Sequence, residues 1–176
     1  MKLFGQAGPG LPPDAGITAQ HLHCASGVTV ALSGGPIWLD GTEAASPAEA
    51  VLAAYGARGT EMLASLSGRF ALAIWDQPGN RILVALDQMG IERLTYARLG
   101  DGLVFSSSAA AVAAVPGVDS SLRPQGLFDF LMLHMIPAPD TIYAGVSKLR
   151  PGTCAILENG RLRVERYWVP RFPETA

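Results

Sequence analysis

The chain has 176 residues, a formal net charge of −2, 49% hydrophobic residues and only 16% charged residues. This length and composition are typical of one folded domain with its own core, and they exclude an intrinsically disordered chain. Because the charge is close to neutral and no long basic stretch occurs, we expect no nucleic-acid partner.

The apolar runs are too short to cross a bilayer, which takes about 20 residues in a helix. The longest one spans residues 127–136, and the first 20 residues are Gly/Pro-rich, without the apolar segment of a signal peptide. Two cysteines, Cys24 and Cys154, do not make a disulfide framework. We therefore expect a cytoplasmic protein with reduced thiols and no membrane partner.

Glycine and proline punctuate the first forty residues. Residues 1–16 are predicted to be a loop-like lead-in. Residues 28–32 are apolar and β-branched, which predicts a strand, and residues 33–36 (Ser-Gly-Gly-Pro) predict a turn. Residues 37–39 would then pair back across that turn.

Two helices are predicted next. Ser46 can cap the first helix, Pro47 suits its first position, and Glu49 completes a capping box. This helix should end near Ala57, and a short second helix should begin at Thr60.

The rest of the chain alternates hairpins with helical blocks. Strands are predicted at residues 70–75, 82–86, 94–98, 103–106, 154–157 and 162–167, and helices at 108–115 and 123–135. Strands in hairpins and helices in separate blocks favour an α+β layered domain over a parallel βαβ sheet.

Five segments of the chain form a recognisable set: GRFALAIWD at 68–76, DQMGI at 87–91, PAPDTIY at 137–143, KLRPG at 148–152 and RYW at 166–168. Together they resemble the glutaminase (glutamine amidotransferase type 2) domain of the asparagine synthetase family. The resemblance implies the four-layer αββα sandwich of antiparallel sheets found in N-terminal-nucleophile hydrolases.

The resemblance also implies a domain plan and a partner. Residues 1–27 would be a lead-in and first edge, 28–168 the amidotransferase-like domain, and 169–176 the start of a connector to a missing synthetase domain. In the family an ATP-dependent synthetase domain follows, so the expected partner is such a domain, fused or separate; a homodimer is a further option. ATP and magnesium are expected only there, so this chain should hold no cofactor and no metal.

The family's nucleophile is a cysteine at the second encoded position, which becomes the N-terminus when Met1 is removed. Its own α-amino group acts as the base, with a pKa near 8. This chain has Lys2 at that position, and a lysine side chain has no thiol chemistry. The comparison therefore predicts no catalytic residue in the chain.

The other glutamine contacts of the family are also missing. Its Asn-Gly-Glu turn matches Gly34, Gly35 and Pro36, so only the backbone donor of Gly35 is kept. Losing one oxyanion donor alone costs roughly 100- to 1000-fold in rate. The family's acidic residue at a helix start matches Pro47. The family's arginine clamp precedes the turn, whereas the first arginine here is Arg58, after it.

These losses favour a degenerate, inactive glutaminase-like domain, a pseudoenzyme. It would dock to and support an ATP-dependent, amide-forming synthetase, as in β-lactam synthetases, which keep this domain without its cysteine. Residues 123–135 and 136–141 are the candidate docking face. Two alternatives stay open: a glutamine-hydrolysing asparagine synthetase fragment acting in asparagine biosynthesis, and a non-enzymatic module that binds a small molecule. Whether the chain is part of an enzyme is left open.

Cys24 would become a nucleophile if residues 1–23 were removed, but Ala25 replaces the usual glycine, and we interpret Cys24 as a small buried thiol. His21 and His23 would share one face of a strand while Cys24 points the other way, so no zinc site is expected.

Several other polar residues are interpreted as structural. His134 should lie at a helix end, and residues 106–108 should end a strand and cap a helix. Asp87 and Arg93 belong to a structural loop, in which Gln88 has replaced the family's arginine.

Overall fold

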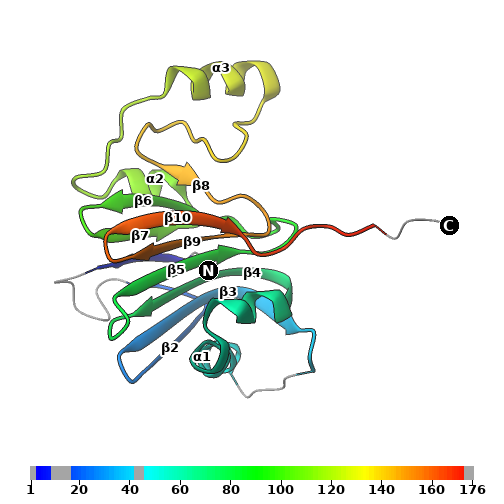
Figure 1. Cartoon of the computed structure of the whole chain (residues 1–176). Coiled ribbons are helices and arrows are strands. Elements are labelled where there is room, and N and C mark those ends of the chain that lie inside the picture. Colours follow the sequence, from blue (N-terminus) through cyan, green and yellow to red (C-terminus); the bar gives the residue numbers. More distant parts are fainter. Residues whose placement is uncertain (1–2, 9–16, 42–45, 173–176) are drawn as a thin grey trace.

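A computed structural model describes residues 3–8, 17–41 and 46–172, and Figure 1 shows two stacked sheets with helices outside them. Both sheets are antiparallel. Sheet A has the order β1 (Phe4–Ala7), β7 (Gly102–Ser106), β6 (Thr95–Leu99), β8 (Ser147–Lys148). Sheet B has the order β10 (Arg161–Arg166), β9 (Thr153–Glu158), β5 (Arg81–Leu86), β4 (Leu66–Asp76), β3 (Val28–Trp38), β2 (His21–Ala25).

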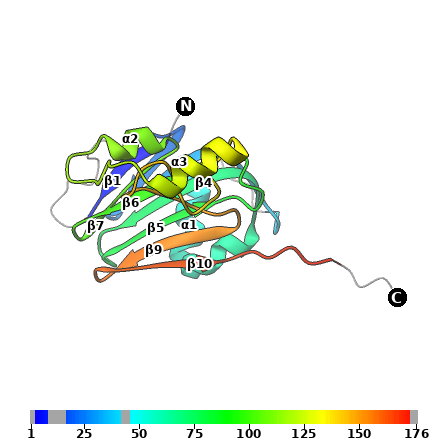
Figure 2. The same cartoon turned by 90° about the horizontal axis from the view of Figure 1, so that it is seen from above.

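The helices lie on the two outer faces. α1 (Pro47–Arg58) and the 3₁₀-helix η1 (Gly59–Ser65) cover sheet B, while α2 (Ala109–Ala113) and α3 (Pro124–Leu133) lie on the side of sheet A (Figures 1 and 2). This arrangement is the predicted αββα sandwich, so the expected fold class is confirmed. No helix among the described residues is long and apolar enough to cross a membrane.

The core follows from the alternation of side chains along the strands. On β4, Phe70, Leu72 and Ile74 face α1, whereas Ala71, Ala73 and Trp75 face sheet A. Because successive residues of β4 are buried on both faces, this central strand reads as a continuous apolar run rather than an alternating one.

The first strand corrects one prediction. Residues 1–16 were expected to form a loop, but Phe4–Ala7 is β1, which pairs with β7 in sheet A. Gly5 suits this position because a Cβ there would lie 2.6 Å from the Phe105 ring. Of the same stretch, residues 1–2 and 9–16 lie outside the described residues.

β3 corrects a second prediction. The expected turn at residues 33–36 is absent, because β3 runs unbroken beside β4 from Val28 to Trp38. On its other side β2 pairs only with residues 28–32, so the second half of β3 is an edge. The amide of Gly34 points to this edge, and the nitrogen of Pro36, two residues on, points the same way. The proline therefore removes no ladder hydrogen bond.

The remaining predicted elements are confirmed, with three differences in detail. The second helix is the 3₁₀-helix η1, which begins at Gly59 with Arg58 as its N-cap rather than at Thr60. Ser46 is the N-cap of α1 and Pro47 its first residue, yet Ser46 makes no side-chain capping bond. The large apolar residues of the helix predicted at 123–135 are exposed, and only Gly126 of α3 is buried.

Candidate functional site

Gly34 has a backbone conformation that excludes a side chain. Its φ is +91°, and a Cβ placed on it would lie 2.4 Å from the carbonyl oxygen of Arg69. That oxygen belongs to the backbone of the neighbouring strand β4 and cannot swing aside. Position 34, which the sequence analysis aligned with the family's asparagine, is therefore sterically restricted to glycine.

The backbone N–H groups of Gly34 and Gly35 both point towards other groups of the protein. The Gly34 amide donates to Oε1 of Gln20 at 3.0 Å. Gly35 lies opposite Arg69 in the β3–β4 ladder, and strand alternation turns its amide towards β4. A Cβ on Gly35 would meet nothing within 4 Å, so open space adjoins Gly35.

The predicted pocket positions are spread over different faces of sheet B. Gly34 and Pro36 are in phase with Leu32, which faces α1, whereas Gly35 is in phase with Ala31, which faces sheet A. Pro47 begins α1. The remaining predicted position, residue 2, lies outside the described residues.

Arg69 is a cation beside this region that the sequence prediction overlooked. It lies opposite Gly35, and its Nε contacts Oε1 of Glu92 at 3.1 Å. The Arg69 side chain is 57% exposed and that of Glu92 21%. The family's arginine clamp is expected before residue 33. Arg69 could not be predicted from the sequence, because only the register of β3 and β4 places Arg69 opposite Gly35.

Asp87 organises the neighbouring loop. It is fully buried, and its carboxylate accepts three backbone N–H bonds at 2.9 to 3.0 Å, from Met89, Ile91 and Glu92. The side-chain amide of Gln88 donates to the carbonyl of Leu66. The structural role predicted for Asp87 is confirmed.

The two cysteines are free and lie in contrasting environments. Cys24, predicted to be buried, is exposed on the edge strand β2, where it accepts a bond from the Thr29 hydroxyl at 3.3 Å. That prediction was wrong because an edge strand leaves one of its faces uncovered. Cys154 is buried in sheet B, and this burial raises the pKa of its thiol to about 11.

The histidines lie on the edge strand β2 and at the end of α3. His21 and His23 pair with Leu32 and Val30 of β3 and share a face, whereas Cys24 points the other way, as predicted. In the described part of the chain, no group of three His, Cys, Asp or Glu residues could hold a metal ion. His134 is the left-handed C-cap of α3, which confirms its predicted place at a helix end.

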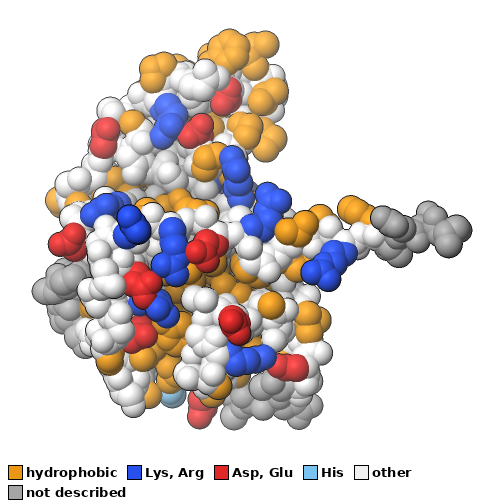
Figure 3. All heavy atoms as spheres, in the orientation of Figure 1, with side chains coloured by type: hydrophobic (Ala, Val, Ile, Leu, Met, Phe, Trp, Pro, Cys, Tyr) orange, Lys and Arg blue, Asp and Glu red, His pale blue; other side chains and the backbone are white. Residues whose placement is uncertain are grey.

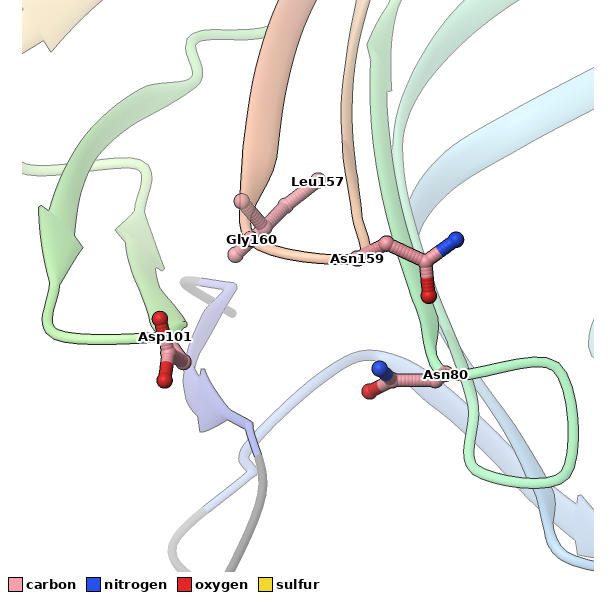
Figure 4. A pocket seen from close by; sticks show the side chains of 5 residues that line it. All are labelled: Asn80, Asp101, Leu157, Asn159 and Gly160. Atoms are coloured by element: carbon pink, nitrogen blue, oxygen red, sulfur yellow. The ribbon is translucent and has the colours of Figure 1, made fainter.

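A cavity of about 200 Å³ lies elsewhere, where three hairpin turns meet. It is lined by Asn80, Asp101, Leu157, Asn159 and Gly160 (Figure 4). Gly34 lies opposite Phe70, whereas this cavity adjoins the turn after Asp76, six residues further along β4. At about 3.3 Å per residue the two places are separated by roughly 20 Å. The cavity is therefore not the predicted glutamine pocket.

Comparison with known proteins supports the resemblance. Residues 40–168 match the family model described as "Glutamine amidotransferase domain". The chain is 33% identical over 129 residues to "Putative asparagine synthetase (glutamine-hydrolyzing)" of Mycobacterium tuberculosis, covering 70% of this chain and 20% of the relative. It is 28% identical over 127 residues to "Asparagine synthetase (glutamine-hydrolyzing) 3" of Bacillus subtilis, covering 72% and 21%. The chain thus spans about a fifth of the length of these relatives.

A solved structure shows the same fold at low identity. It is titled "Structure of the allosteric regulatory enzyme of purine biosynthesis", with a TM-score of 0.51 and 15% identity, covering 88% of this chain and 32% of that one. The family match begins at residue 40, so it includes Pro47 but not Gly34, Gly35 and Pro36. With a match over most of its length, this chain belongs to the glutamine amidotransferase domain family and is related to the asparagine synthetases.

Proposed function

We propose that this chain is a glutamine amidotransferase domain that no longer hydrolyses glutamine. It would instead dock to and support an ATP-dependent, amide-forming synthetase domain, either fused to it or separate. The proposal places ATP and magnesium in that partner and assigns this chain no cofactor of its own. We also place the protein in the cytoplasm.

The backbone at Gly34 carries the proposal. Acyl transfer from glutamine passes through an oxyanion, which needs hydrogen-bond donors held at fixed positions. An asparagine amide cannot replace Gly34, because its Cβ would lie 2.4 Å from the Arg69 carbonyl oxygen. The Gly34 amide is already bonded to Gln20. The strand therefore offers no free donor from residue 34.

Substrate recognition is weakened in the same way. Pro36 and Pro47 have neither a carboxylate for the substrate amine nor a backbone N–H. Arg69, the nearby guanidinium, is paired through its Nε with Glu92, so a substrate carboxylate would have to compete with this ion pair. These features agree with the prediction that Lys2 stands in place of the nucleophile.

The names of the relatives favour one alternative, a glutamine-hydrolysing asparagine synthetase fragment. Another residue would then have to act as the nucleophile, for example Cys24 after cleavage of residues 1–23. Cys24 is exposed on β2, at the edge of sheet B, whereas the first strand of the uncleaved chain, β1, lies at the edge of sheet A. Cleavage before Cys24 would therefore also remove a strand of sheet A. We therefore rank this alternative second.

The test is glutamate release from glutamine by the purified chain, with its N-terminus defined by intact mass. The Bacillus subtilis relative, named as glutamine-hydrolysing, is the positive control. We expect no turnover above buffer. Turnover that is lost in Cys24→Ala, together with a mass showing cleavage before Cys24, would overturn the proposal in favour of a maturing glutaminase.

A further inference from the structure

α3 and the residue after its cap present an apolar surface to solvent. We call residues 124–135 the apolar arm. Figure 3 shows hydrophobic side chains gathered over it. Its large side chains are between 45% and 66% exposed: Leu127, Phe128, Phe130, Leu131, Met132, Leu133 and Met135. Such a contiguous patch is uncommon on a domain that acts alone.

The exposure is built into the fold. The arm stands away from both sheets (Figure 1). At its base, a Cβ on Gly126 would lie 2.7 Å from the Thr141 carbonyl oxygen, so the helix backbone is in close contact with the following segment. Arg123 donates to the Ala144 carbonyl at 2.8 Å and pairs with Asp140 at 2.9 Å. These contacts fix the base of the arm to residues 140–144.

Cations lie beside the base of the arm. Lys148 donates to the carbonyl of Ile136, and Arg150 to that of Ala138 at 3.4 Å. Burial lowers the pKa of Lys148, and the charge of Arg93 lowers it further, while the carboxylate of Asp140, which is itself paired with Arg123, acts in the opposite direction. Among the described residues no ion pair joins Arg93, Lys148 or Arg150 to a carboxylate. We call these three residues the basic base.

We propose that the apolar arm and the basic base form one docking face for the synthetase domain, which meets it with an apolar groove bordered by Asp and Glu. This rests on the function proposed above and names its contact surface. Charge complementarity selects the partner, because unpaired cations beside an apolar patch favour an acidic rim.

The first experiment is site-specific photocrosslinking in cells of the source organism. The photoreactive residue p-benzoyl-phenylalanine replaces Phe130, and the matched control replaces Leu22, which is 50% exposed on β2. We expect position 130, and not position 22, to crosslink to a polypeptide segment that mass spectrometry identifies as an ATP-dependent synthetase domain. A crosslink to a second copy of this chain, or none at position 130, would overturn the proposal.

The second experiment tests the charges. Lys148→Glu with Arg150→Glu should lower the crosslinking yield at position 130 at least tenfold, whereas Arg161→Glu with Arg166→Glu on β10 should leave it within twofold. Equal losses in both double variants would contradict a specific basic base. Thermal unfolding of each variant confirms that it is folded.

A lipid surface is the competing occupant, since anionic lipids also attract apolar patches with adjacent cations. Co-sedimentation of the chain with vesicles of phosphatidylglycerol and phosphatidylcholine should show no binding. Binding lost in Phe130→Asp would replace the proposal with a membrane contact. The glutaminase assay is independent of these results. Turnover of glutamine would contradict the proposed inactivity but leave the docking face unaffected. A crosslink from another position only would contradict the docking face and leave the proposed inactivity unaffected.

Discussion

A Cβ atom built on Gly34 would lie 2.4 Å from the carbonyl oxygen of Arg69, across the β3–β4 ladder. Gly34→Asn, which introduces the asparagine expected from the sequence alignment, should therefore lower the free energy of unfolding by about 3 kcal/mol, from the positive φ and the backbone clash together. Urea unfolding measures the loss.

Gly35→Ala is the matched control for that change. A Cβ on Gly35 meets nothing within 4 Å, so alanine should leave stability unchanged or raise it by up to about 1 kcal/mol. Equal destabilisation at both positions would show that the two glycines are constrained alike and would contradict the geometry of Gly34.

Asp87 ties together the loop that follows β5. Asp87→Asn keeps the shape but replaces one carboxylate oxygen by an NH₂ group facing backbone donors. Three N–H groups rely on this carboxylate, so the expected loss is about 3 kcal/mol by chemical denaturation. Asp101→Asn, on an exposed turn, should change stability by less than about 0.5 kcal/mol. A loss below 1 kcal/mol for Asp87→Asn would be inconsistent with this role.

The two thiols should differ in reactivity. With iodoacetamide at pH 8, the exposed Cys24 should be alkylated in the folded protein. Cys154 should stay unmodified until denaturant is added, because it is buried and burial raises its thiol pKa to about 11. Peptide mass spectrometry locates the label. Rapid labelling of Cys154 in native conditions would mean that sheet B opens near β9.

Stability should fall at alkaline pH. The Cys154 thiol is neutral when protonated, and its pKa is raised from 9.0 to about 11 by burial. The unfolded chain therefore releases this proton at lower pH than the folded chain does. The free energy of unfolding should be insensitive to this group below pH 9 and should decrease as the pH rises from 9 to 11. Burial also raises the pKa of Tyr167, which acts in the same direction.

Thermal unfolding at several pH values between 8 and 11 tests this expectation. Cys154→Ala should flatten the decrease relative to the parent chain, whereas Cys24→Ala should leave its slope unchanged. An unchanged slope in Cys154→Ala would assign the alkaline loss to the tyrosines instead.

Local patterns in the sequence were sufficient for the central hairpins and for α1. Apolar runs separated by turn residues predict β4, β5, β6, β7, β9 and β10, because these strands pair with close neighbours along the chain. The resemblance then supplied the layered sandwich, which periodicity alone does not specify.

Long-range relationships explain what the sequence did not predict. β1 is a short strand whose glycine is required by the ring of Phe105, a partner far along the chain. The Ser-Gly-Gly-Pro segment resembles a turn, and only the limited reach of β2 shows that Pro36 can lie within a strand. The periodicity of α3 predicts a helix, but not whether its apolar residues face the core or solvent.

β1 also has a consequence for how the domain is completed. Phe4 pairs with Ser106, about a hundred residues later, so sheet A cannot close during synthesis until β7 has emerged. Pairings of such long sequence separation slow folding. A version of the protein shortened by its first eight residues would leave β7 as an open sheet edge and expose the apolar strand to self-association.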